Sequence, residues 1–237
     1  MCRDCGCGDP ELVSVELHEK ILGDNDARAQ HLREHFAEDG VVALNIMGSP
    51  GAGKTALLEA TAHAVHDRGG RWRLGAFSGD LATDRDAARL ERAGIPAASI
   101  TTGSACHLDA KMVHHALHHA PFGEVDFLFI ENVGNLVCPA IYDLGQAANV
   151  VVLAVTEGED KPLKYPVMFR HADLVVLTKT DLLPHLEVDV GAIESALVRV
   201  MLRPRMLPVS AKSGEGLDAW IEWLEGLRAP AALADAR

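Results

Sequence analysis

The sequence lacks any apolar run of the roughly 20 residues that a membrane-spanning helix needs. It also lacks a surplus of basic residues, because its 237 residues carry 22 Lys and Arg against 34 Asp and Glu, a formal net charge of −12. Nucleic acids and anionic membranes bind basic patches, so we expect neither as a partner. The polar, cysteine-bearing first residues do not form a secretory leader, which favours a cytoplasmic protein.

Cysteine is scarce, and its count of five is odd. Complete pairing is therefore impossible, and stable disulfides are rare in a reducing compartment. Three of the five thiols, Cys2, Cys5 and Cys7, fall in the first seven residues as C-x-x-C-x-C. This spacing lets three thiolates reach one ion, with the terminal amino group as a possible fourth ligand. Such an open site suits a metal ion that is transferred to another molecule. The alternatives are a redox dithiol and an inert tail.

Apolar, β-rich runs alternate with helical patterns along most of the chain. The expected strands are Val41–Met47, Trp72–Ser78, Asp126–Glu131, Val150–Val155, Leu174–Thr178 and Met206–Val209. The expected helices are Glu11–Glu38, Thr55–Arg68, Ala87–Ala93, Ser104–Ala120, Ile193–Met201 and Gly216–Leu227. This alternation predicts an α/β fold with a mostly parallel central sheet, covered by helices on both faces. We expect a cysteine-rich tail over residues 1–10, a helical segment over 11–39 and the α/β domain over 40–230.

The stretch GSPGAGKT, Gly48–Thr55, matches the P-loop pattern G-x-x-x-x-G-K-[ST] between a predicted strand and a predicted helix. Glycines allow the tight turn that aims backbone N–H groups at phosphates, and the helix N-terminus adds a favourable dipole. Lys54 is expected to reach the β- and γ-phosphates, and the Thr55 hydroxyl to bind Mg²⁺. The expected phosphate-binding residues are Gly48, Ser49, Pro50, Gly51, Ala52, Gly53, Lys54, Thr55 and Ala56.

Two later segments indicate that the nucleotide is GTP. LTKTDLL resembles the Asn-Lys-x-Asp element of GTPases, with Thr178 in place of the Asn that normally ties this loop to the P-loop. Asp181 can accept from guanine N1 and N2, a donor pair that adenine lacks, and the stem of Lys179 can cover the base. VSAKSGEG resembles the Ser-Ala-Lys loop that contacts guanine O6, which adds Ser210, Ala211 and Lys212 to the expected base site.

Carboxylates near the γ-phosphate are needed for Mg²⁺ and hydrolysis. Glu131 ends a predicted strand, and Asp80 follows another, so we assign both to the Mg²⁺ shell with Thr55. Lys54, Thr55, Asp80 and Glu131 are thus the expected catalytic set. The alternative for each carboxylate is the cap of a helix or turn. No water-positioning Gln follows Gly134, which predicts slow intrinsic turnover.

A second metal site is indicated by Cys106, His107 and Cys138, which follow segments on the nucleotide side of the predicted sheet. Thiolate and imidazole suit Zn²⁺, Ni²⁺ or Cu(I), but three ligands are one short of a closed tetrahedral zinc site. Buried cysteine can also be a small hydrophobe. Two histidine pairs spaced by four residues, His114 with His118 and His115 with His119, could bind metal or form a polar helix face.

The ordered set of motifs resembles the HypB family of hydrogenase nickel-incorporation GTPases. The matching segments are MCRDCGCG, LNIMGSPGAGKTALLE, SGDLATDRDA, TTGSACHLDA, LFIENVGNLVCPA, KPLKYPVMF and SAKSGEGLDAW. The resemblance implies a SIMIBI-class GTPase that forms a homodimer around nucleotide and metal. It also implies a G-domain Ni²⁺ or Zn²⁺ site at Cys106, His107 and Cys138, and a high-affinity nickel site at Cys2, Cys5 and Cys7.

The resemblance further implies a small zinc-bearing partner, HypA, and delivery of Ni²⁺ to the large subunit of [NiFe]-hydrogenase. The long His-rich stretch of many family members is missing here. We expect GTP and Mg²⁺ to order the Asp80 and Glu131–Cys138 segments, so that the nucleotide state moves the metal ligand Cys138. The alternatives are a P-loop kinase or ATPase, a GTPase that serves another nickel enzyme such as urease, and a non-enzymatic metal buffer or sensor.

Overall fold

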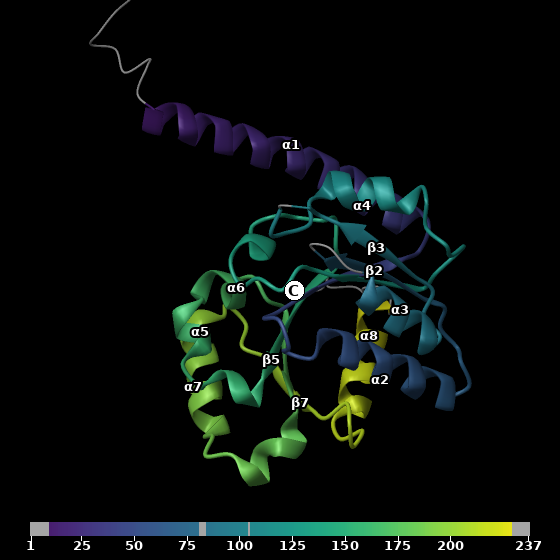
Figure 1. Ribbon diagram of the computed structural model, residues 1–237, viewed down its shortest axis with the longest axis vertical. Coiled ribbons are helices and arrows are strands. Elements are labelled where there is room, and N and C mark those ends of the chain that lie inside the picture. The colour runs from purple at the N-terminus through teal and green to yellow at the C-terminus, as the bar shows by residue number, and fades with distance from the viewer. Residues whose placement is uncertain (1–9, 81–83, 104, 229–237) are drawn as a thin grey trace, which may run out of the picture.

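The computed structural model describes residues 10–80, 84–103 and 105–228 (Figure 1). In this part of the chain, seven strands form one sheet in the order β3-β2-β4-β1-β5-β6-β7. The strands are β1 Val42–Met47, β2 Leu74–Asp80, β3 Ala97–Thr101, β4 Phe127–Glu131, β5 Ala148–Ala154, β6 Leu174–Thr178 and β7 Met206–Val209. Every neighbouring pair is parallel. The predicted α/β fold with a parallel central sheet is therefore confirmed.

Helices cover both faces of the sheet. The longer ones are α1 Pro10–Glu38, α2 Lys54–Asp67, α3 Arg85–Arg92, α4 Ala110–Leu117, α7 Val190–Val200 and α8 Leu217–Arg228, and the short ones are α5 Lys161–Lys164 and α6 Pro166–Arg170. Successive β4 side chains enter opposite cores: Phe127 and Phe129 pack with residues of α2, α3 and α8, whereas Leu128 and Ile130 pack with residues of α1 and α4. A third cluster lies between β5, β6, α6 and α7. The sheet is thus buried on both faces, as its near-continuous apolar strands require.

The helix expected over Ser104–Ala120 begins later than predicted. Asp109 is its N-cap and accepts a hydrogen bond from the Met112 amide at 2.7 Å, so α4 starts at Ala110. A carboxylate at this position satisfies an amide that the helix leaves without a partner. Cys106 and His107 therefore lie in the loop before α4, not at the start of the helix as we predicted.

The C-terminal half of α1 is docked on the sheet, whereas its first half projects beyond the other elements (Figure 1). Leu32 and Phe36 are buried in the core shared with α4. The Asn25 side chain accepts from the Ala110 amide and donates to the Asp143 carbonyl, both at 2.9 Å. These bonds fix α1 against the start of α4. No helix in the described ranges combines the length and apolar character needed to cross a membrane.

Candidate functional site

The P-loop runs from the end of β1 into α2. Gly48 has φ +150°, and a Cβ there would overlap the Val152 carbonyl of β5, so only glycine fits. The Lys54 ammonium folds back over the loop and donates to the carbonyls of Gly48 and Ser49, at 3.2 and 3.3 Å. Burial lowers the pKa of Lys54, while the charge of Glu131 opposes that change. The loop therefore presents a buried cation where phosphates would lie.

Two carboxylates lie close to the hydroxyl group of Thr55, the residue after Lys54. Thr55 Oγ1 lies 2.8 Å from Glu131 Oε1 and 3.1 Å from Asp86 Oδ1. Burial raises the pKa of Glu131 to about 7, against the opposing effect of Lys54 and the Thr55 hydrogen bond. The second oxygen of Glu131, Oε2, is buried and has no hydrogen-bond partner. An orphaned carboxylate oxygen beside a P-loop hydroxyl fits a hard divalent cation such as Mg²⁺.

A cavity of about 420 Å³ extends from this point along the P-loop. Asp80, at the end of β2, lines the cavity with Glu131; its place in the Mg²⁺ shell stays a prediction. Asp86 lines it too and contacts Thr55, although sequence reasoning missed it. Its signal lay in the same segment, SGDLATDRD, because an acidic residue in the first turn of the helix after β2 faces the P-loop edge. Arg89 also lines this cavity and forms ion pairs with Glu59 at 2.7 Å and with Asp86 at 3.3 Å.

A second cavity, of about 490 Å³, adjoins the first at the start of α2. Its lining residues are Gly53, Ala56, Glu59, Ala60, His63, Thr178, Lys179, Asp181, Leu182, Ala211 and Lys212. Thr178 Oγ1 donates to the Ala52 carbonyl at 2.5 Å, so threonine makes the tie to the P-loop for which GTPases normally use Asn. The buried Ser210 hydroxyl donates to Asp181 Oδ1 at 2.8 Å and orients that carboxylate. The two cavities share Gly53 and Ala56, which suits a nucleotide with its base in one and its phosphates in the other.

Cys106, His107 and Cys138 form a compact cluster, which we call the thiolate centre. Their candidate ligand atoms all lie within 4.8 Å of one another. Both cysteines are free, and the Cys106 thiol donates to Cys138 Sγ across 3.1 Å, well beyond the roughly 2.05 Å of a disulfide. The hydrogen bond with Cys106, and then burial, raises the pKa of Cys138. Two sulfurs and an imidazole fit a soft or borderline cation with at least one position left for a further ligand.

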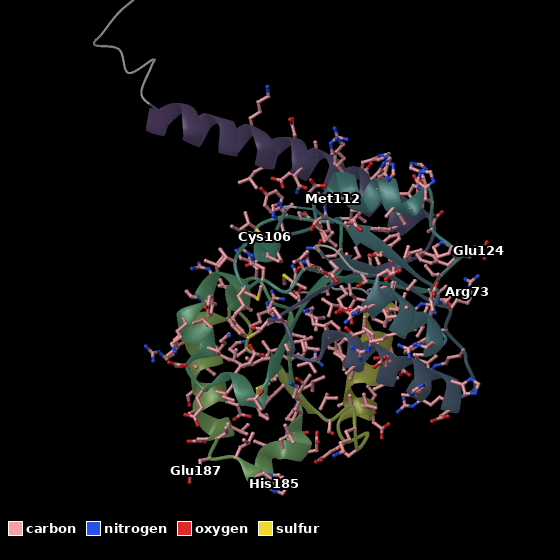
Figure 2. The ribbon with its side chains drawn as sticks, viewed as in Figure 1. Arg73, Cys106, Met112, Glu124, His185 and Glu187 are labelled. Atoms are coloured by element: carbon pink, nitrogen blue, oxygen red, sulfur yellow. The ribbon has the colours of Figure 1, made fainter. Side chains whose placement is uncertain are left out.

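The imidazole of the thiolate centre is also held in place. The His107 ring stacks on Tyr142 with centroids 3.8 Å apart and planes 21° apart. Burial lowers the pKa of His107, with Asp109 opposing the change. This change favours the neutral ring, which is the form that binds a metal. Figure 2 labels Cys106 in the segment that leads into α4, close to the end of the sheet.

One short segment, Glu131–Cys138, joins the nucleotide cavity to the thiolate centre. Next to Glu131, the buried side chain of Asn132 accepts from the backbone amides of Leu108 and Val133, at 3.1 and 3.0 Å. Leu108 follows His107 directly. A Cβ on Gly134 would come within 2.7 Å of the Pro50 ring, so this turn lies directly on the P-loop. Both sides of the thiolate centre are thus anchored beside the phosphate site.

The remaining predicted ligands lie elsewhere. Cys2, Cys5 and Cys7 are outside the described residues. His114 and His118 have ring centroids 4.8 Å apart, and His115 and His119 have theirs 4.9 Å apart. None of these four histidines belongs to the thiolate centre.

Comparisons with known proteins agree with this arrangement. A family model described as CobW/HypB/UreG, nucleotide-binding domain, matches residues 42–204, which include the P-loop and the whole thiolate centre. The hydrogenase maturation factor HypB of Azotobacter vinelandii is 50% identical over 214 residues, covering 90% of this chain and 70% of that protein. The hydrogenase/urease maturation factor HypB of Helicobacter hepaticus is 42% identical over 220 residues, covering 91% of this chain and 89% of that protein. The crystal structure of HypB from Helicobacter pylori in complex with nickel superposes with a TM-score of 0.81 at 36% identity, covering 90% of this chain and 99% of that one.

Proposed function

This chain belongs to the HypB family of hydrogenase maturation factors, and from that premise we propose that it is a GTP-hydrolysing metallochaperone for nickel. It delivers the ion to the large subunit of [NiFe]-hydrogenase. The observation that carries the proposal is the Glu131–Cys138 segment, which ends in a nucleotide-site carboxylate on one side and a thiolate ligand on the other. A change in one site is therefore transmitted to the other over a few residues.

GTP is the substrate of the first site. Asp181 accepts from the guanine edge while Ser210 holds the carboxylate in place, and Lys179 covers the base. Lys54 exchanges its carbonyl partners in the P-loop for phosphate oxygens. Mg²⁺, when bound, neutralises charge on the phosphates; Thr55 and Glu131 hold it, with Asp80 nearby. The absence of a glutamine after Gly134 supports slow turnover.

Nickel is the cargo of the second site. The thiolate centre offers sulfur and imidazole, which suit Ni²⁺ and also Zn²⁺, and the HypB relative from Helicobacter pylori was crystallised with nickel. Cys2, Cys5 and Cys7 supply a second nickel site in this proposal. A HypA-type zinc/nickel protein and the hydrogenase large subunit are the proposed partners.

A homodimer completes the thiolate centre. Val137 and Ile141 lie close to Cys138 in the sequence, and their exposed fractions of 48% and 47% are high for large apolar side chains beside the half-buried thiolate centre. Apolar surface at such a position is typical of a protein interface. The second subunit, or water, then fills the coordination position that Cys106, His107 and Cys138 leave open. Dimerisation that depends on GTP would connect hydrolysis to metal release.

The test is nickel transfer from the loaded, reduced protein to the metal-free hydrogenase large subunit. We expect transfer with GTP to exceed transfer with GDP, and Lys54→Ala to remove the difference, because this variant loses the phosphate-binding cation. In cells that lack the gene, hydrogenase activity should return when nickel is added to the medium. Equal transfer with both nucleotides would contradict the proposal.

Urease is a second candidate client. The relative from Helicobacter hepaticus is named a hydrogenase/urease maturation factor. The same assay with metal-free urease as acceptor separates the two clients. GTP-dependent activation of urease but not of hydrogenase would assign the chain to urease.

A further inference from the structure

The fold brings together two histidine pairs that lie far apart in the sequence. His31 and His35 are one turn apart on α1, and His114 and His118 are one turn apart at α4. The rings of His31 and His114 have centroids 5.8 Å apart, and those of His114 and His118 have centroids 4.8 Å apart. We call these four residues the interhelical histidine cluster. Figure 1 shows the two helices lying side by side.

The contact between these helices is part of the folded core. Asn25 is 6% exposed and caps the start of α4 through the Ala110 amide. Leu32 lies one residue after His31, and Phe36 one residue after His35, and both are fully or almost fully buried. The two histidines therefore stand at the edge of the buried stripe of α1, held beside α4 by their neighbours.

The surroundings of the cluster suit a metal ion. His35 Nδ1 lies 3.1 Å from Asp39 Oδ2, a carboxylate–histidine pair that leaves Nε2 available as a ligand. A cavity of about 540 Å³ adjoins His35, His114 and His118, with three carboxylates also on its wall. These carboxylates are Glu38, Asp39 and Glu124.

We propose that the interhelical histidine cluster is an additional metal site, which holds a divalent late transition ion such as Ni²⁺, Zn²⁺ or Cu²⁺ through imidazole nitrogens. It is separate from the thiolate centre and goes beyond the proposed GTP-dependent transfer. Among the described residues, only the thiolate centre has three ligand atoms within 4.8 Å of one another. The imidazoles must therefore converge by rotation of their largely exposed side chains, so the site binds more weakly than thiolates and exchanges its ion quickly.

The experiment isolates imidazole binding in the full-length chain. All five cysteines are replaced by serine, at positions Cys2, Cys5, Cys7, Cys106 and Cys138. Calorimetric titration with Ni²⁺ should still detect one site. Adding His114→Ala and His118→Ala should weaken that site by more than about tenfold, because loss of a ligand costs at least as much as loss of a partner that only orients one.

His115→Ala with His119→Ala is the matched control, because these residues form an equally spaced pair on the same helix segment with no ring contact to α1 in the described residues. We expect this control to keep the site. His31→Ala with His35→Ala should weaken it as His114→Ala and His118→Ala do, and it changes only exposed side chains of α1. Equal weakening by the control pair, or no weakening by either cluster pair, would overturn the proposal. Neither result affects GTP-dependent transfer, which is measured with the cysteines present.

Discussion

The backbone amide of Leu108 donates a hydrogen bond to Asn132 Oδ1 at 3.1 Å. This bond joins the loop that carries Cys106 and His107 to the residue that follows Glu131. The Asn132 amide in turn donates to Asn45 Oδ1 of β1 at 3.1 Å, so the junction is anchored in the centre of the sheet. A displacement of β4's end on nucleotide binding would thus move both halves of the thiolate centre.

Replacing Asn132 by Ala should uncouple the two sites. The variant loses the acceptor for Leu108, so the loop before α4 no longer follows the end of β4. We expect nickel affinity to become nearly independent of whether GTP or GDP is bound. The free energy of unfolding should also fall by about 1–3 kcal/mol, because buried groups of Asn45 and Leu108 lose a partner. Nickel titrations with each nucleotide and urea unfolding measure the two effects.

Asn149→Ala is the control for that loss of stability. Asn149 Oδ1 accepts from Asn45 Nδ2 at 3.1 Å, at the half-buried end of the same chain of amides, and no hydrogen bond to Leu108 involves it. This variant should be destabilised by a similar amount and keep its nucleotide-dependent nickel affinity. If it also loses that dependence, the effect of Asn132 reflects stability rather than a connection between the sites.

The raised pKa of Glu131 predicts how the stability of the protein without nucleotide and metal depends on pH. Its pKa is about 7 in the folded protein, against an ordinary value of 4.5. The folded state therefore holds the proton more tightly, and this stabilising contribution is present below pH 4.5 and is lost as the pH rises through 7. Glu131→Gln removes the charge and should be more stable than the wild type at pH 8 by up to about 3 kcal/mol. The difference should shrink towards zero near pH 4.5; a constant difference in urea unfolding at both pH values would contradict this prediction.

Asp181→Asn should change the base that the protein prefers. Hydrogen bonds to a charged group contribute about 1.5–3 kcal/mol each, so losing the carboxylate should reduce GTP affinity at least about 100-fold. Xanthosine triphosphate should bind the variant better than GTP does, because its C2 oxygen accepts from the new amide. Fluorescence competition with GTP, ATP and xanthosine triphosphate tests this. Unchanged GTP affinity would show that Asp181 does not contact the base.

Gly134→Ala tests the contact between the P-loop and the turn that contains Gly134. The added Cβ would lie 2.7 Å from the Pro50 ring and 3.0 Å from the Pro50 nitrogen, which forces the two segments apart. We expect slower GTP turnover and weaker nucleotide binding. Gly123→Ala is the matched control, since a Cβ there meets nothing within 4 Å. Steady-state phosphate release from both variants gives the comparison.

Features that depend on contiguous residues could be predicted from the sequence. The P-loop is one segment, and the segments DFLFIE and LVVLT are apolar except at their ends because helices bury both of their faces. β3, Ala97–Thr101, was missed because AASIT contains small and polar residues at the edge of the sheet, where burial is incomplete. The short helices α5 and α6 were missed because each has a proline in its first turn and spans a few residues only.

Features that depend on residues far apart could not be predicted. Asp86 contacts Thr55 across 31 positions of the sequence; its place at the start of a helix was a signal, but the contact itself depends on how that helix packs beside the P-loop. The nearness of Cys106 to Cys138 is the exception: it was predicted because the segments that carry them both leave the nucleotide side of the predicted sheet. The approach of His31 to His114 depends on how α1 docks on α4, and the sequence of α1 alone contains no sign of it.

The most direct test of the account is the nickel affinity of the thiolate centre in two nucleotide states. Replacing Cys2, Cys5 and Cys7 by serine leaves Cys106, His107 and Cys138 as the thiolate-containing site, whose nickel–sulfur absorption distinguishes it from histidine sites. The affinity would be measured with Mg²⁺ and a non-hydrolysable GTP analogue, and again with Mg²⁺ and GDP. The account predicts a difference of at least about tenfold, equivalent to roughly 1.4 kcal/mol of coupling free energy. Equal affinities in the two states would contradict the central claim that nucleotide hydrolysis controls the metal.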